Sequence, residues 1–270
     1  MTPNILYTMS AERVDVDHPE LSAFFFQQQA AYTFCMKYCK HKTVLEIGSG
    51  SGYGANRIAD VATSVLCIDK DKTSIEKSKI IFQKKNIQFI CTGIEQFHPH
   101  QQFDVIISLQ VIEHISPHHL DQYLRTIQAS LKSNGICIFS TPNAPRSSYN
   151  ENPYHYIEYS GDAVRRILLK YFTEVKLYGV MGDDHVERFE DARKRRVLSF
   201  FSFDPLSLRK LLPRKIRQFL FDLASFANRK TLNAQIAEFR SISEKNYRIS
   251  PFNPNSAIDS IVVCQKPPVL

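Results

Sequence analysis

The 270-residue sequence predicts an α/β protein with a mostly parallel sheet. The first observation behind this prediction is an apolar run at residues 44–47 that passes directly into alternating glycines. The second is another apolar run, residues 65–69, which ends in Asp69 about 20 residues after the glycine loop. The third is that further short apolar runs alternate with helical patterns along the chain.

Length and composition fit one α/β domain with a substantial insertion. No stretch approaches the roughly 18 apolar residues of a membrane span, and no basic region followed by an apolar core marks a signal peptide. The six cysteines contain no C-x-x-C pair, which fits a reducing cytoplasm. We expect four of them to be buried free thiols in strands: Cys67, Cys91, Cys137 and Cys264.

The net charge of +7 is concentrated in the last quarter of the chain. From residue 200 onward, eleven Lys and Arg stand against five Asp and Glu, a local surplus of +6. A local surplus of this kind indicates a partner surface and says little about the fold.

The expected elements follow one another in alternating order. Residues 18–39 form an unbroken helical run without Gly or Pro, and Ser160 is a helix-capping residue. Further helices are expected at 55–61, 73–85, 117–131 and 161–172. Strands are expected at 44–47, 65–69, 87–91, 103–110, 136–140, 173–180 and 257–264.

The glycine loop has the sequence E-I-G-S-G-S-G-Y-G from Glu46 to Gly54. Glycine permits backbone torsions that other residues avoid, and it lets a ligand approach the main chain closely. No Lys-Ser pair closes the loop, so it is not a P-loop, and its glycines are more closely spaced than in G-x-G-x-x-G.

This loop resembles the E/D-x-G-x-G-x-G sequence of class I S-adenosylmethionine (SAM) methyltransferases, whose fold is Rossmann-like. The resemblance implies that the loop contacts the methionine end of SAM. Asp69 can accept hydrogen bonds from both ribose hydroxyls, and Gly93 and Ile94 can pack on the adenine. The expected cofactor-binding residues are Glu46, Gly48, Ser49, Gly50, Gly52, Tyr53, Asp69, Lys70, Gly93, Ile94, Leu109 and Gln110.

The resemblance also implies a seven-stranded sheet of order 3-2-1-4-5-7-6, in which the last strand is antiparallel. We divide the chain into a helical lead-in (1–40), a SAM-binding core (41–181), an insertion (182–256) and the last strand with its tail (257–270). The 75-residue insertion is expected to be a helical cap, because a connection of that length carries its own structure.

Three further motifs narrow the resemblance: V-I-E-H-I at 111–115, S-T-P-N at 140–143 and N-P-x-H-x-x-E-Y-S at 152–160. Together they resemble a bacterial subgroup with many methyltransferases encoded beside surface-glycan genes. An E-R-x element at Glu12-Arg13-Val14 resembles a segment that folds over the cofactor in one methyltransferase subgroup. The resemblance spans roughly residues 12 to 181.

Two histidines are expected at the carboxyl ends of strands, where open α/β sheets bind ligands. A hydroxyl acceptor has to lose its proton, and histidine is a suitable base near neutral pH. We therefore predict His155 as the general base, with His114 and Glu113 lining the pocket.

A metal-assisted reaction is the main alternative for this cluster. Small-RNA 3′-end and ubiquinone-pathway methyltransferases carry E-x-x-E-H here and use it to hold a divalent metal, and the RNA enzymes add a later histidine. This chain has Gln110-x-x-Glu113-His114, and an amide is a poorer ligand than a carboxylate for hard cations. A divalent metal and an RNA 2′-O-methyltransferase activity are therefore less favoured.

Residues 205–228 combine an apolar helical stripe with a basic cluster. One interpretation is a lid that buries its stripe against its own domain. The other is contact with an acidic surface such as the cytoplasmic membrane face. Nucleic acid is less favoured, because the cluster lacks interleaved aromatics. The stripe is Ile216, Phe219, Leu220, Leu223 and Phe226, and the cluster is Arg209, Lys210, Arg214, Lys215 and Arg217.

The sequence thus predicts a cytoplasmic SAM-dependent methyltransferase that yields S-adenosylhomocysteine (SAH). The expected acceptor is a hydroxyl of a sugar or glycan precursor, with a lipid-linked form left open. The alternative from another class is a catalytically silent SAM-binding protein that regulates partners.

Overall fold

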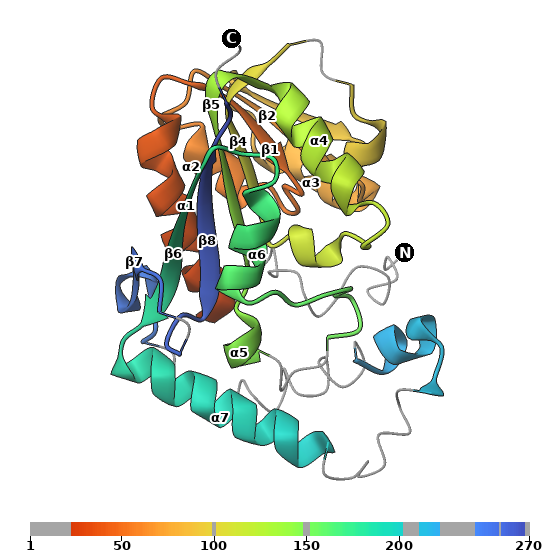
Figure 1. Ribbon diagram of the computed structural model, residues 1–270, viewed down its shortest axis with the longest axis vertical. Coiled ribbons are helices and arrows are strands. Elements are labelled where there is room, and N and C mark those ends of the chain that lie inside the picture. The colour runs from red at the N-terminus through yellow and green to blue at the C-terminus, as the bar shows by residue number, and fades with distance from the viewer. Residues whose placement is uncertain are drawn as a thin grey trace.

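A computed structural model describes residues 23–98, 101–147, 152–201, 211–221, 241–253 and 255–267. Its centre is an eight-stranded sheet of order β3-β2-β1-β4-β5-β8-β6-β7 (Figure 1). Strands β1 to β5 run parallel, whereas β8 is antiparallel to both β5 and β6, and β7 is antiparallel to β6. The strands are β1 (Thr43–Ile47), β2 (Ser64–Asp69), β3 (Ile87–Cys91), β4 (Phe103–Leu109), β5 (Leu131–Pro142), β6 (Glu174–Gly182), β7 (Tyr247–Pro251) and β8 (Asp259–Gln265).

Helices cover both faces of the sheet (Figure 1). The α-helices are α1 (Ala23–Cys39), α2 (Tyr53–Ile58), α3 (Lys72–Ile81), α4 (Leu120–Ser130), α5 (Ala144–Ser147), α6 (Gly161–Leu168) and α7 (Asp184–Phe201). Short 3-10 helices are η3 (Ile94–Gln96), η4 (Ile112–His114) and η7 (Glu244–Asn246), and a further helical segment covers residues 214–221. No helix of the described ranges is both long and apolar enough to cross a bilayer.

Two hydrophobic clusters fill the space between the sheet and its helices. Adjacent strand residues point to opposite faces. Val44 therefore packs in the cluster beneath α1, α2 and α3, and Leu45 packs in the cluster beneath α4 and α6. Because helices cover both faces of the sheet, side chains on both faces of its strands are buried, and the strands read as continuous apolar runs.

The predicted α/β class and the order of the seven predicted strands are confirmed. The sheet has one strand more than expected, because residues 182–256 supply the edge strand β7 in addition to helices. Cys67, Cys137 and Cys264 are buried free thiols as predicted, but the prediction for Cys91 is wrong. Cys91 is exposed because it ends β3, the edge strand of the sheet. The expected element at residues 12–14 lies outside the described ranges.

Helix α1 is tied to the sheet through buried polar contacts. The Tyr32 hydroxyl donates a hydrogen bond to Glu46 Oε1 over 2.6 Å, and Gln27 Nε2 donates to Asp259 Oδ2 over 2.6 Å. The Tyr32 ring also packs so tightly on α2 that a Cβ added at Gly54 would lie 1.9 Å from its Cζ. Gly54 therefore allows α1 and α2 to meet above β1.

Glu46 is 2% exposed, and its burial has an energetic consequence. Burial raises the pKa of this carboxyl from 4.5 to about 7, although the hydrogen bond from Tyr32 acts in the opposite direction. The folded state thus retains a proton that the unfolded chain releases. The resulting stabilisation is complete below pH 4.5 and is lost as the pH rises through about 7.

Replacing Glu46 with Gln should flatten the dependence of stability on pH. Between about pH 5 and pH 8 the wild type should lose up to about 3 kcal/mol of unfolding free energy more than Glu46→Gln, since the neutral amide does not titrate. Thermal unfolding across this pH range measures the difference. Glu76→Gln, an exposed carboxylate on α3, is the matched control and should follow the wild type. Parallel profiles for the wild type and Glu46→Gln would contradict the assignment.

Candidate functional site

The carboxyl ends of β1, β2, β3 and β4 lie side by side, because these strands are parallel neighbours. The residues expected to bind the cofactor lie at these four strand ends: Glu46 to Tyr53 at and beyond the end of β1, Asp69 and Lys70 at the end of β2, Gly93 and Ile94 after β3, and Leu109 and Gln110 at the end of β4. The structure therefore brings segments separated by up to 64 residues to one edge of the sheet.

The glycine loop has a left-handed backbone at Gly48, Gly50 and Gly52, with φ of 73°, 51° and 76°. A side chain in this region would be strained, so the loop depends on glycine. A Cβ at Gly48 would also lie 2.5 Å from Val111 Cγ2. Gly48 therefore packs directly on the residue that precedes η4, and the loop touches the segment that carries Glu113 and His114.

Asp69 is held against the glycine loop. Its Oδ2 accepts a hydrogen bond from the Gly50 amide over 2.8 Å, and its Oδ1 accepts one from the Asp71 amide over 2.8 Å. Asp71, rather than Asp69, caps α3 through the Ser74 amide. Each carboxylate oxygen has a second lone pair beyond these bonds, so Asp69 can accept further donors at this edge.

The other expected cofactor residues occupy varied environments. Tyr53 donates a hydrogen bond to Gln28 of α1, and Lys70 is exposed. Ile94 and Leu109 are 6% and 8% exposed. Gln110 has a φ of 56°, and its side chain donates to Ser140 Oγ and Asp259 Oδ2 over 3.2 and 3.0 Å.

The residues at the loop fit a SAM-type cofactor. Glu46 Oε2 and Ser49 Oγ are buried and have no hydrogen-bond partner among the described residues. A Cβ at Gly50 would meet nothing within 4 Å, so the backbone there is open to a ligand. Unpaired acceptors beside an open glycine backbone suit a ligand with amino and hydroxyl donors.

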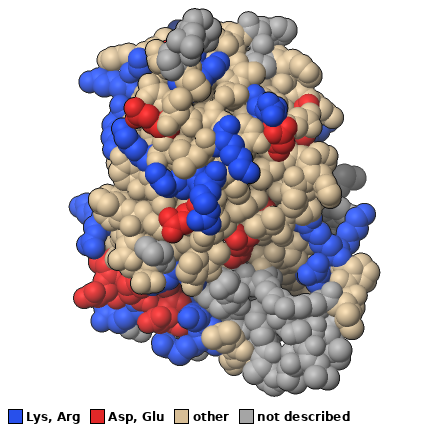
Figure 2. Space-filling model, viewed as in Figure 1, with Lys and Arg blue, Asp and Glu red and all other residues tan. Residues whose placement is uncertain are grey.

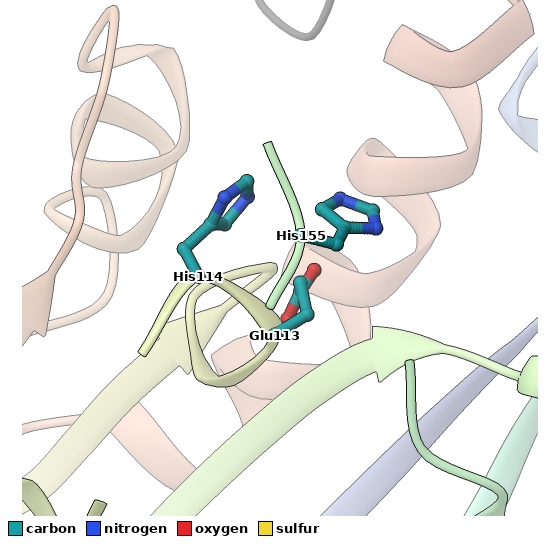
Figure 3. Close-up of side chains that lie close together, drawn as sticks. All are labelled: Glu113, His114 and His155. Carbon is teal, nitrogen blue, oxygen red and sulfur yellow. The ribbon is translucent and has the colours of Figure 1, made fainter. Parts of the chain in front are cut away.

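Glu113, His114 and His155 form a cluster whose potential ligand atoms all lie within 4.8 Å of one another (Figure 3). The two imidazole rings meet edge to face, with centroids 4.8 Å apart. Figure 3 shows the Glu113 carboxylate beside the His155 ring. The three residues predicted from sequence as the acceptor pocket are thus brought together, two from η4 and one from the loop that follows α5.

Glu113 is the most deeply buried member of this cluster. It is fully buried, and among the described residues the Thr141 side chain is the one hydrogen-bonding group beside its carboxylate. Burial raises its pKa to about 8, against the opposing effect of the nearby His155. Glu113 therefore favours the protonated form near neutral pH until a cation or a hydrogen-bond donor reaches it.

His155 is oriented by two neighbours, Glu158 and Asn152. Its Nδ1 lies 2.9 Å from Glu158 Oε1, and its Nε2 lies 3.1 Å from Asn152 Nδ2. An amide nitrogen can only donate, so Nε2 is the acceptor and Nδ1 carries the proton that Glu158 accepts. Ser147 donates to the other Glu158 oxygen over 2.6 Å. Sequence reasoning did not assign Glu158, although its place three residues after His155 was a usable signal.

Asp259 is a second residue that sequence reasoning missed. It begins β8 and lies opposite Pro142, so it reaches the same edge as the cluster. It is 5% exposed, accepts hydrogen bonds from Gln27 and Gln110, and burial raises its pKa to about 7. Its position in the otherwise apolar run A-I-D-S-I-V-V-C was the available signal.

The helix at 214–221 packs against the loop that carries His155. Arg214 donates from Nε to the Pro153 carbonyl over 2.9 Å and from Nη2 to the Tyr154 carbonyl over 2.8 Å. Its guanidinium also lies 3.8 Å from the centre of the Tyr156 ring. On the other side of the loop, the Tyr156 amide donates to the Glu113 carbonyl over 2.7 Å. The His155 loop is therefore held between η4 and this helix.

The chain matches known methyltransferases in sequence. Residues 29–184, more than half of the chain, match the family described as "Methyltransferase domain". A probable S-adenosylmethionine-dependent methyltransferase of Mycobacterium tuberculosis is 29% identical over 202 residues, which cover 72% of this chain and 70% of that protein. The ubiquinone biosynthesis O-methyltransferase of Rickettsia typhi is 34% identical over 108 residues, which cover 39% of this chain and 43% of that protein.

Solved structures show the same fold. The N-methyltransferase NodS of Bradyrhizobium japonicum, in complex with SAH, superposes with a TM-score of 0.51 at 18% identity, over 58% of this chain and 81% of that chain. A SAM-dependent methyltransferase of Thermotoga maritima, a possible histamine N-methyltransferase, superposes with a TM-score of 0.55 at 11% identity, over 90% and 92%. The chain therefore belongs to the methyltransferase-domain family and is an S-adenosylmethionine-dependent methyltransferase.

Proposed function

We propose that this methyltransferase methylates a hydroxyl of a sugar or related glycan precursor, with His155 as the general base. Bound SAM supplies a methyl group that is activated by the positive charge on its sulfur. The observation that carries the proposal is the geometry of His155, whose Nδ1 lies 2.9 Å from Glu158 Oε1 and whose Nε2 lies 3.1 Å from the Asn152 amide nitrogen. A hydroxyl that replaces the Asn152 amide at Nε2 would meet a ring nitrogen placed to take its proton.

The cofactor is held, in this proposal, at the edge formed by β1 to β4. Glu46 and the glycine loop bind the methionine end, and the Asp69 carboxylate accepts the ribose hydroxyls. Gly93 and Ile94 flank the adenine. The contact between Gly48 and Val111 supports this arrangement, because it makes the cofactor loop adjacent to the Glu113 and His155 cluster.

A polyhydroxyl acceptor is supported by the unpaired oxygens near this cluster. Beside the Thr141 hydroxyl, the Glu113 carboxylate has no further hydrogen-bond partner among the described residues, and the buried Tyr159 hydroxyl near it has none. A sugar offers several hydroxyls that can satisfy such groups. The named activity of the Rickettsia relative, O-methylation, points the same way, and a lipid-linked form of the acceptor fits as well.

Metal-assisted activation of the hydroxyl is the second candidate, and an RNA 2′-hydroxyl would be one such acceptor. It is favoured by the close grouping of Glu113, His114 and His155. A divalent cation would satisfy the buried Glu113 carboxylate and lower the pKa of a bound hydroxyl. Gln110 stands where the metal-dependent enzymes have a carboxylate, and an amide is a poorer ligand for a hard cation, so direct proton transfer to His155 is the simpler mechanism.

Replacing Asp69 with Asn should weaken SAH binding at least tenfold, measured by titration calorimetry. The single oxygen of Asn can keep the hydrogen bond from the Gly50 N–H or the one from the Asp71 N–H, but not both. The amide also lacks the charge that makes a hydrogen bond from a hydroxyl worth about 1.5–3 kcal/mol. Asp60→Asn is the matched control, because Asp60 pairs with Lys84 at the surface. Unchanged affinity in a folded Asp69→Asn protein would overturn the cofactor assignment.

Replacing His155 with Ala should lower kcat by roughly 10²–10⁴-fold while SAH affinity stays within about threefold. Glu158→Gln should lower kcat by roughly tenfold or more and move the acidic limb of the pH–rate profile to lower pH, because an amide stabilises protonated imidazole less. SAH release with a panel of sugar acceptors provides the assay.

Glu174→Gln, at a surface pair with Lys176, is the control and should leave the profile unchanged. The assay with a chelator separates the two mechanisms. Activity that survives chelation supports His155 as base. Activity that is lost and then restored by a divalent metal, or a His155→Ala protein as fast as wild type, would overturn it.

A further inference from the structure

The helix at 214–221 has the reverse of the usual amphipathic arrangement. Its polar side chains Arg214 and Gln218 point inward and donate to the carbonyl of Pro153. Phe221 packs on the Tyr154 ring, with centroids 6.3 Å apart, but the other apolar residues point outward. Ile216, Phe219 and Leu220 are 46%, 66% and 44% exposed, and Leu211, just before the helix, is 81% exposed.

A surface helix normally buries its apolar stripe against its own domain and leaves its polar side in water. The expectation that residues 205–228 form a lid of that kind is not met by the described residues, 211–221. The predicted stripe residues Leu223 and Phe226 lie outside the described ranges, as do the basic residues Arg209 and Lys210. Grouped apolar exposure of this kind marks an interaction surface.

Charge distinguishes the possible occupants of this surface. Residues 211–221 carry no acidic residue. Of their three basic residues, Lys215 is exposed, whereas Arg214 donates inward to Pro153 and the Nε of Arg217 is buried. Figure 2 shows Lys and Arg side chains beside uncharged ones at the lower right, where the light blue segment lies in Figure 1. A two-fold contact between copies of the chain would place Lys215 of each copy in an interface that offers it no acidic partner from residues 211–221, because each copy presents the same patch. An anionic surface instead complements this lysine.

We propose that the helix at 214–221, together with residues 211–213 before it, docks on an anionic lipid surface as an interfacial helix. Phe219, Leu220, Ile216 and Leu211 enter the boundary between headgroups and acyl chains, and the exposed Lys215 stays at the phosphate level. Long basic side chains beside an apolar face are typical of helices that lie in the membrane plane.

The inner face of the same helix makes this docking relevant to the active site. Arg214 holds the carbonyls of Pro153 and Tyr154, and Tyr154 is followed directly by His155. The Tyr154 carbonyl also lies 3.3 Å from His114 Nδ1. A lipid surface bound by the outer face would thus be separated from the His155 loop only by the helix at 214–221.

Vesicle co-sedimentation of the full chain tests the proposal, and it does not depend on the acceptor or on methyl transfer. The wild type should bind vesicles of equimolar phosphatidylcholine and phosphatidylglycerol, and not pure phosphatidylcholine. Binding should fall severalfold when salt rises from about 0.05 M to about 0.5 M. The double variant Ile216→Ser/Phe219→Ser should bind at least about tenfold more weakly. Lys215→Glu should bind severalfold more weakly.

Ile80→Ser is the matched control, because Ile80 is 72% exposed on α3, outside the proposed surface. It should bind within about twofold of wild type. Thermal unfolding and SAH binding establish that each variant is folded. Absence of binding to anionic vesicles at low salt would overturn the proposal, as would equal losses in Ile80→Ser and the double variant. A dimer in sedimentation velocity that disappears in the double variant would assign the surface to a second copy instead.

Discussion

Burial of three carboxyl groups at one edge of the sheet is the constraint on which the rest of this structure depends. Burial raises the pKa of Glu46 and Asp259 to about 7 and that of Glu113 to about 8. Groups of this kind destabilise the fold when ionised unless donors reach them. Helix α1 supplies two such donors, Tyr32 for Glu46 and Gln27 for Asp259. The helix that precedes the first strand is therefore a structural part of the site.

The remaining unpaired oxygens explain how the fold is suited to binding. Within the part of the chain that the structure describes, Glu46 has one unpaired oxygen beside the glycine loop, and the Glu113 carboxylate beside His155 has only the Thr141 side chain next to it. The contact of Gly48 with Val111 makes these two places neighbours. A cofactor and an acceptor would complete the hydrogen bonding of both carboxyls. Binding would therefore offset the desolvation cost of these buried groups, which folding alone does not offset.

The core of the fold and half of the site followed from local sequence patterns. Apolar runs with a period of two or 3.6, and the glycines that end one of them, depend only on neighbouring residues, so Gly48, Asp69 and the strands themselves were accessible. The strand order came from the family resemblance. What was missed depends on distant partners. Strand β7 is five residues long and pairs with β6 across the insertion. Asp259 gains its role from Gln27, 232 residues away.

The direction of the helix at 214–221 was also beyond sequence reasoning. Its pattern showed an apolar stripe and a basic cluster. Which side faces the domain depends on the carbonyls of Pro153 and Tyr154, which only the folded loop presents to Arg214.

Methyl transfer to oxygen is the central claim of this account, and the most direct measurement is the identity of the methylated atom. The protein would be incubated with SAM labelled with carbon-13 in the methyl group and a panel of sugars, nucleotide sugars and amino sugars, and the products observed by proton–carbon correlation NMR. The account predicts an O-methyl signal with the wild type that is lost with His155→Ala. A signal from N-methyl groups alone would contradict it. So would an O-methyl product that forms at the same rate with the wild type and with His155→Ala.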